Sequence, residues 1–318
     1  MKKFILRLIA FTTIYLLFLL TAITMPPTPR SKESLIFGEK MKDSLLNIKS
    51  SNRIIFIGGS NLTFGLDSKT IKDSLHVTPI NTALHAGLGL KYMLDHTRPY
   101  IHAGDIVIVS PEYAHFFGGS LNGEEVLLWM LLDVSPGDIK NLSYDQWRNI
   151  LPHLNKYALS KFNPSNYLNV KTEACYKVTS FNNFGDATAH WSMKNTEVTP
   201  MKSIYGEFNV NAVHELKNFE KFVSNKKAKM FISYPGLQNS SSINITGQIA
   251  KVDRELMKAK LPILSSPTRY RVPDSLIFNS PYHLSKKGVD LRTRLLIQDL
   301  RGILNHSTNT LSNHLSME

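Results

Sequence analysis

Two polar residues, Ser60 and His283, stand where an α/β protein could use them for chemistry. Ser60 follows the apolar run Arg53–Ile57 and two glycines in "RIIFIGGSNLTFG". Such a run is typical of a strand buried on both faces of a parallel sheet, and glycines permit a sharp turn or a close backbone approach. The Ser60 hydroxyl is therefore expected at the carboxyl end of a central strand, where open α/β sheets bind ligands. The alternative is that Ser60 only caps a helix.

His283 lies in "NSPYHLSKKG", just before an amphipathic helical pattern. Pro281 and Tyr282 restrict the backbone that leads to it, so the imidazole should have a fixed place. A histidine in that place can act as the base that takes a proton from a serine. The alternative is a helix-capping histidine without a catalytic role.

Four stretches together resemble the SGNH (GDSL-type) hydrolase superfamily, and within it the membrane-anchored members found with bacterial surface-polysaccharide genes. The stretches are "IGGSNLTFGLDS", "NTALHAGLGLKYML", "GDIVIVSPEYAHFF" and "NSPYHLSKKG", and the resemblance covers residues 53–304. It implies Ser60 as nucleophile and His283 as base. It also implies an oxyanion hole formed by the amides of Ser60 and Gly87, with Gly89 as the next closest match.

The chain departs from the family pattern at two places. Where the family carries an aspartate shortly before the histidine, this chain has Asn279, which can orient an imidazole through its carbonyl oxygen; Asp186 and Asp274 are alternative acids. Where the broader superfamily has an oxyanion-donating asparagine, this chain has Glu112, and an ionised carboxylate cannot donate a hydrogen bond. Asn61 and Glu112 are further candidate pocket residues.

Composition limits the other classes of site. The chain has 318 residues, a formal net charge of +12 and a single cysteine, Cys175, so it has neither an internal disulfide nor a cysteine-based zinc cluster. Its positive charge is spread along the chain, without a zinc finger or a dense arginine helix, and this favours an anionic membrane surface over nucleic acid. The histidines are scattered without a carboxylate pattern, so we expect no metal and no cofactor.

The N-terminal residues predict a membrane anchor. Residues 1–7 form a short basic tail, and the 18 residues 8–25, "LIAFTTIYLLFLLTAITM", carry no charge. That length is about the minimum for a hydrocarbon core of ~30 Å. A cleaved signal peptide is the alternative, but no small-x-small cleavage pattern is evident. The short tail with its lysines favours an extracytoplasmic domain on a single span.

Beyond the anchor, residues 26–52 are interpreted as a stalk and residues 53–304 as one domain. Strand and helix patterns alternate there, which predicts a mostly parallel five-stranded sheet with helices on both faces, the three-layer α/β/α (flavodoxin-like) arrangement. Residues 113–209 interrupt the alternation as a helical and irregular insertion, and residues 305–318 form a polar tail. The expected strands are residues 54–57, 77–81, 106–110, 230–234 and 263–265.

Two functions follow as hypotheses. The first is a serine esterase or O-acyltransferase that acts on acyl esters of a cell-surface glycan or glycolipid, with a membrane-bound O-acyltransferase as a possible partner. The second is a catalytically inactive SGNH-like domain that binds glycan or scaffolds a membrane polysaccharide-assembly complex. Hydrolysis and transfer share an acyl-enzyme, so the residues do not separate them.

Overall fold

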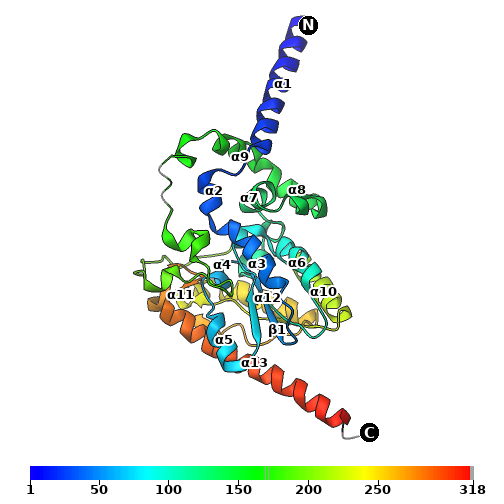
Figure 1. Ribbon diagram of the computed structural model, residues 1–318, viewed down its shortest axis with the longest axis vertical. Coiled ribbons are helices and arrows are strands. Elements are labelled where there is room, and N and C mark those ends of the chain that lie inside the picture. Colours follow the sequence, from blue (N-terminus) through cyan, green and yellow to red (C-terminus); the bar gives the residue numbers. More distant parts are fainter. Residues whose placement is uncertain (169, 171, 316–318) are drawn as a thin grey trace.

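A computed structural model describes residues 1–168, 170 and 172–315 (Figure 1). The helices are α1 (Lys2–Thr24), α2 (Pro29–Glu33), α3 (Glu39–Leu46), α4 (Ser60–Thr63), α5 (Ser68–Leu75), α6 (Leu90–Thr97), α7 (Glu125–Asp133), α8 (Tyr144–Ile150), α9 (Leu154–Lys161), α10 (Val210–Asn225), α11 (Asn239–Asn244), α12 (Thr246–Lys258) and α13 (Lys286–Leu315). The strands are β1 (Arg53–Gly58), β2 (Thr78–Asn81), β3 (Ile106–Ser110), β4 (Lys229–Ile232), β5 (Leu237–Gln238), β6 (Arg271–Val272), β7 (Ile277–Ser280) and β8 (His283–Leu284).

The central sheet is parallel, in the order β2-β1-β3-β4. Every residue of β1 is buried, as expected for a strand covered on both faces. Helices α6 and α10 pack against each other, and α5 packs against α13. The expected parallel α/β sheet is therefore present.

The expectation of five strands is wrong for the described residues, in which the sheet has four. The fifth segment, residues 263–265, is reduced to a single parallel bridge between Ile263 and Ile232. Pro262 precedes the bridge and has no N–H to donate, and a second proline follows at position 267. The two prolines therefore limit the pairing of this segment with β4 to one bridge.

The strand order places a topological switch at β1. The chain leaves β1 for β2 on one side and then crosses to β3 on the other. In open parallel sheets ligands bind at the carboxyl ends of the strands on either side of such a switch. Here those ends are Gly58 of β1 and Ser110 of β3, which are register partners.

The first helix has the character expected of a membrane span. Helix α1 is long and apolar enough to cross a bilayer, and it projects away from the rest of the chain (Figure 1). Its large side chains are open to the surroundings; Phe4 and Phe11 are each 69% exposed. A core helix would bury such residues, so a lipid environment explains this exposure better than packing does.

The segment 26–52 is not a free stalk, because it packs into the domain. Leu46 is buried in the main core, and Lys42, buried in α3, donates to the carbonyl oxygens of Asn81 (2.9 Å) and Gly185 (2.7 Å). The insertion 113–209 carries α7, α8 and α9, which lie at the α1 end of the molecule, and its later part returns to the sheet, where Thr196 N–H bonds the Phe278 carbonyl oxygen (Figure 1). Helix α13 continues to Leu315 through most of the polar tail, and residues 316–318 lie outside the described part.

A buried ion pair holds the amino end of β1. Arg53 bonds both carboxylate oxygens of Asp105, at 2.9 Å from Nε and 2.5 Å from NH2, and both side chains are almost fully buried. The guanidinium also donates to the carbonyl oxygens of Leu46 (2.6 Å), Ile48 (3.1 Å) and Tyr100 (2.7 Å). One cation thus joins the segment before β1 to the segment before β3.

We expect Asp105→Ala to lower the free energy of unfolding by about 3–5 kcal/mol, because it leaves the Arg53 charge buried without its counter-ion. The measurement is denaturant unfolding of the protein in detergent. Asp73→Ala is the control, since the Lys69–Asp73 pair is exposed (70% and 58% of the side chains) and its loss should leave the free energy of unfolding nearly unchanged. Equal effects of the two substitutions would contradict the structural role of the buried pair.

Candidate active site

Ser60 lies where its sequence context predicts, directly after β1 and at the start of α4. Two glycines allow it to be there. A Cβ on Gly58 would lie 2.6 Å from the Ser110 carbonyl oxygen, and a Cβ on Gly59 would lie 2.9 Å from Glu112 Oε1. The backbone of β1 can therefore approach the end of β3 only because both positions lack a side chain.

The Ser60 hydroxyl bonds a carboxylate rather than an imidazole. Ser60 Oγ donates to Glu112 Oε1 (3.0 Å), and the same oxygen accepts the backbone N–H of Asn61 (3.0 Å). Glu112 is 5% exposed and its backbone N–H donates to His115 Nδ1 (3.1 Å). Glu112 therefore occupies the region in which donors for an oxyanion were expected.

A buried cation stands behind this carboxylate. Arg292 of α13 is 1% exposed, and its guanidinium donates to the backbone oxygen of Asn61 (2.8 Å) and to Ser110 Oγ (3.3 Å). Burial lowers the pKa of Arg292 to about 10, and the nearby charges of the Tyr270 and Glu112 side chains act in the opposite direction. Arg292 thus remains positive at neutral pH and compensates the charge of Glu112. The Asn61 side chain, which donates to the Ser110 carbonyl oxygen (3.1 Å), is part of the same framework.

His283 is oriented by Asn279. The His283 Nδ1 atom lies 2.8 Å from Asn279 Oδ1, and the Asn279 amide nitrogen donates to the Tyr176 hydroxyl (2.7 Å). Because Tyr176 takes the amide N–H, the amide oxygen faces the ring, and Nδ1 must carry the proton. Nε2 is then left with a lone pair, as a base requires. Tyr176 lies in the irregular insertion, where no sequence pattern pointed to it.

Apolar and aromatic groups surround the imidazole. The Phe64 ring lies against His283 (centroids 4.3 Å apart), and the Phe64 carbonyl oxygen accepts the Leu284 N–H (3.3 Å). Burial, followed by the positive potential of His85 and His190, lowers the pKa of His283 to about 3. The ring is therefore neutral at physiological pH. Phe64 ends the helical turn that Ser60 begins, so His283 packs against the residue that follows this turn, whereas the Ser60 hydroxyl bonds Glu112.

The glycines expected near the oxyanion have separate roles. The Gly87 N–H donates to His85 Nδ1 (3.0 Å), and the Gly87 carbonyl oxygen accepts the Glu124 N–H (2.8 Å). The Gly87 amide must leave the His85 ring before it can bind an oxyanion. Gly89 has φ +79° and its Cβ would lie 2.2 Å from the Gly123 nitrogen, so it shapes the turn into α6.

Neither alternative acid bonds to His283. Asp186 is fully buried and accepts from the Ser68 N–H (2.8 Å), Ser68 Oγ (2.8 Å) and Asn81 Nδ2 (2.9 Å). Burial raises its pKa, against these hydrogen bonds. Asp274 accepts from the backbone N–H of Ser240 (3.1 Å) and from its hydroxyl. Both carboxylates hold loops together, and Asn279 is the residue beside the histidine.

Two cavities are lined by neighbours of the site residues, and neither lining includes Ser60 or His283. One, of about 270 Å³, has a mainly apolar lining that includes His85 and Tyr176. The other, of about 600 Å³, is lined in part by Glu124, Tyr205 and Tyr282. The complete lining of the smaller cavity is Ser34, Leu35, Ile36, His85, Glu125, Val126, Trp129 and Tyr176. The smaller cavity is thus lined by His85, which accepts the Gly87 N–H, and by Tyr176, which accepts the Asn279 amide N–H.

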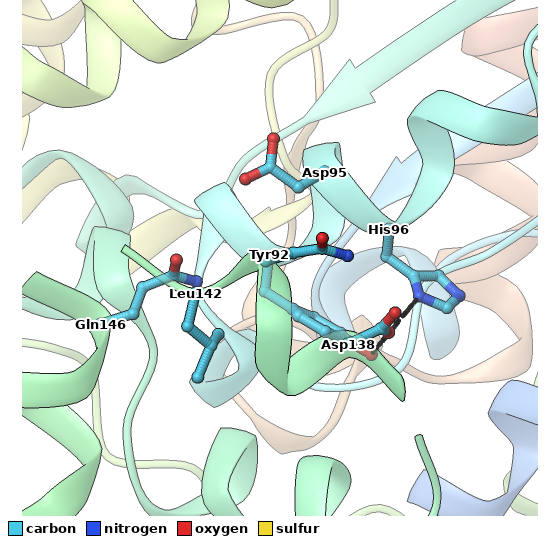
Figure 2. Close-up of a pocket in the computed structure, with 7 residues that line it drawn as sticks. Tyr92, Asp95, His96, Asp138, Leu142 and Gln146 are labelled. Carbon is cyan, nitrogen blue, oxygen red and sulfur yellow. Dashed lines mark hydrogen bonds and ion pairs between the residues drawn. The ribbon is translucent and has the colours of Figure 1, made fainter. Parts of the chain in front are cut away.

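A separate cluster surrounds His96 on α6. Figure 2 shows Tyr92 and His96 pointing to Asp138, which lies 3.1 Å from the Tyr92 hydroxyl and 2.8 Å from His96 Nδ1. His96 Nε2 lies 2.8 Å from both Glu39 and Asp43 of α3. Although burial alone would lower it, the three carboxylates raise the pKa of His96 far above its ordinary value.

Part of this cluster also has the geometry of a candidate metal site. Glu39, Asp43 and His96 place one ligand atom each within 4.8 Å of the others, so these described residues could hold a cation. A protonated His96 already supplies a positive charge to the carboxylates. We therefore interpret the cluster as a tie between α3, α6 and residues 136–141. Sequence reasoning missed it because the carboxylates come from distant segments.

Comparison with known proteins finds no matching family and no matching curated protein. The interpretation of the site therefore rests on its geometry and on the resemblance of the four sequence stretches.

The position of Glu112 generates a prediction. Removing one oxyanion donor from an enzyme costs about 10²–10³ in rate, so replacing a charged acceptor by a neutral donor should produce a sizeable gain. We expect Glu112→Gln to raise the rate of p-nitrophenyl acetate hydrolysis by about tenfold, because its amide keeps the shape and can donate to an oxyanion. The double variant Ser60→Ala/Glu112→Gln is the control and should show no gain. A lower rate for Glu112→Gln would mean that the carboxylate assists Ser60 directly.

Proposed function

We propose that the chain is a membrane-anchored serine esterase or O-acyltransferase of the SGNH type. In this proposal Ser60 attacks the acyl carbonyl, His283 Nε2 takes the hydroxyl proton and then passes it to the leaving group, and Asn279 holds the ring. The Ser60 and Gly87 amides would bind the oxyanion once Gly87 leaves the His85 ring. Water or a sugar hydroxyl would then accept the acyl group.

The observation that carries the proposal is the chain of contacts from His283 to Asn279 to Tyr176. A merely structural histidine has no need of a neighbour whose amide is itself fixed by a third side chain. The 2.8 Å contact and the 2.7 Å contact behind it select one tautomer, the one with a basic Nε2. A base and an orienting group are two of the three parts used for nucleophilic catalysis, and Ser60 would be the third once its hydroxyl turns from Glu112 to His283.

The two cavities suggest how the substrates would divide. The smaller one lies near the lower end of the ~300–1,000 Å³ range of ligand pockets, so it suits a short acyl group better than a long chain. The larger cavity has Tyr205, which is 89% exposed, and Lys202 in its lining. An exposed aromatic ring beside a cation suits a polar glycan or glycolipid head group.

The wider setting belongs to the same proposal. We infer a three-layer α/β/α domain of the SGNH type on a single span, with the domain on the extracytoplasmic side. Its acyl donor or glycan would come from the cell surface, with a membrane-bound O-acyltransferase as a possible partner. No cofactor, metal or nucleic acid has a part in the mechanism.

A second candidate is a catalytically inactive domain that binds glycan or scaffolds a polysaccharide-assembly complex. Two observations favour it. Ser60 Oγ bonds Glu112 rather than His283, and the Gly87 N–H is occupied by His85. Both contacts must change before an acyl-enzyme can form.

The deciding experiment is labelling of the full-length protein with a fluorophosphonate probe, which reacts with activated serines. We expect labelling of the wild type and its loss in both Ser60→Ala and His283→Gln. Ser68→Ala is the control, because Ser68 is a buried serine bonded to Asp186. Absence of labelling in the wild type and in Glu112→Gln would move the conclusion to the inactive domain.

The pH profile of kcat/KM tests whether His283 acts as the base. Because the pKa of His283 is lowered to about 3, the ring remains a free base well below neutral pH. We expect kcat/KM for an ester to stay level down to about pH 5, whereas a histidine with an ordinary pKa of about 6.5 would lose activity there. In Asn279→Asp the added carboxylate favours the imidazolium, so the acid limb should move towards neutral pH and turnover should rise. A wild-type acid limb near pH 6.5 would contradict the buried, neutral base.

A further inference from the structure

The length of the uncharged part of α1 determines which of its residues lie in lipid. The uncharged residues 8–25 extend over about 27 Å as a helix, which nearly equals a hydrocarbon core of ~30 Å. The charge of Arg7 limits a shift that would draw the N-terminal end of α1 into the lipid. Pro26 ends the span at its other end. The region of α1 that lies in lipid is therefore fixed within a few residues.

Helix α9 contacts α1 inside that region. The Phe18 ring stacks on Phe162 (centroids 5.2 Å apart), and the Tyr15 hydroxyl donates to Asn155 Oδ1. Phe18 and Tyr15 precede the end of α1 at Thr24 by six and nine residues, or about 9 and 14 Å along the axis. Tilt of α1 would reduce these depths, but both contacts stay on the membrane side of its exit.

Helix α9 buries an ion pair, and large apolar side chains are exposed on it and just after it. Leu159 and Phe162 are 64% and 47% exposed, and the polar Asn155 and Lys156 are exposed too. Lys161 is 1% exposed, and its ammonium bonds Asp133 Oδ1 of α7 (2.7 Å) and the Pro26 carbonyl oxygen (3.2 Å). Tyr157, fully buried, donates to the same Asp133 oxygen (2.7 Å). A helix in lipid must satisfy its polar groups internally, as this buried ion pair does.

The apolar surface continues on both sides of α9. Leu151 before it and Leu168 after it are 49% and 66% exposed. Exposed apolar residues that gather on one surface mark an interaction site. The one strongly exposed lysine of α9, Lys156, has its ammonium 2.6 Å from Glu125 Oε2 of α7, so its charge is directed at the domain.

We propose that α9 and its flanking residues form a second membrane contact, a helix seated in the bilayer interface beside α1. Leu159, Phe162 and Leu151 would enter the acyl region, and the Lys161–Asp133 pair would stay on the protein side. The domain would then be held at a fixed height and rotation above the lipid rather than swinging on one span. This inference does not depend on catalysis at Ser60.

The test uses the full-length protein in vesicles of phosphatidylethanolamine and phosphatidylglycerol at a low protein-to-lipid ratio. An environment-sensitive fluorophore is attached at Leu159→Cys in a Cys175→Ala background. The matched control is Ile243→Cys on α11, which is apolar and similarly exposed (58%) but lies far from α9 (Figure 1). We expect lipids with a nitroxide on the acyl chain to quench the probe at position 159 at least about threefold more than at position 243.

Equal quenching at the two positions would overturn the proposal. So would a blue-shifted but unquenched probe at position 159, because that result would mean that a second copy of the chain covers the surface. Phe162→Cys and Met257→Cys repeat the comparison at a second pair of sites, so a folding defect in one variant does not decide the outcome. Stronger quenching at both 159 and 162 supports the seat in the membrane.

Discussion

The close approach of β1 and β3 at their carboxyl ends is the constraint on which the site depends. Gly58 and Gly59 have no side chain, so the end of β1 can lie against the Ser110 carbonyl and the Glu112 carboxylate. The same approach brings Ser60, Asn61 and Glu112 into one hydrogen-bonded group at the switch of the strand order. A β-carbon at Gly58 would collide with the Ser110 carbonyl oxygen, and one at Gly59 would collide with Ala86 and the Glu112 carboxyl, so either would force β1 away from these groups.

Burial lowers the pKa of His283 on one side of the site and of Arg292 on the other. His283 is held neutral by desolvation and by two nearby histidines, while the Glu112 carboxyl lies near the buried cation Arg292. A neutral base can accept a proton from Ser60, but a negative group beside the serine opposes an oxyanion. The neutral His283 is available as a base, but a pKa of about 3 makes it a weak one, and the Glu112 carboxyl opposes the charge that would follow. Substrate binding that moves Glu112 would resolve the conflict.

The sequence was a good guide where local chemistry decides the structure. The run Arg53–Ile57 with its two glycines predicted a buried strand and the position of Ser60, and the Pro281–Tyr282 approach predicted a fixed His283. It failed where distant segments meet. Tyr176, which fixes the Asn279 amide, lies in the irregular insertion, and the carboxylates around His96 come from segments far from it in the sequence, so no spacing reveals such partners. The fifth strand failed for a local reason, since prolines at both ends left a single bridge.

The segment 26–52 shows why an anchor and its domain should be considered together. Its place after the apolar span suggested a stalk with a possible short helix, yet Lys42 and Leu46 are buried in the domain and Arg53 bonds the carbonyl oxygens of Leu46 and Ile48. A flexible tether would let the domain sample many heights above a bilayer. A packed connection, joined to α1 by only a few residues, transmits the orientation of the span to the sheet. Under the proposed membrane insertion of α1, the carboxyl ends of the strands, and with them Ser60, would have a defined direction relative to the lipid.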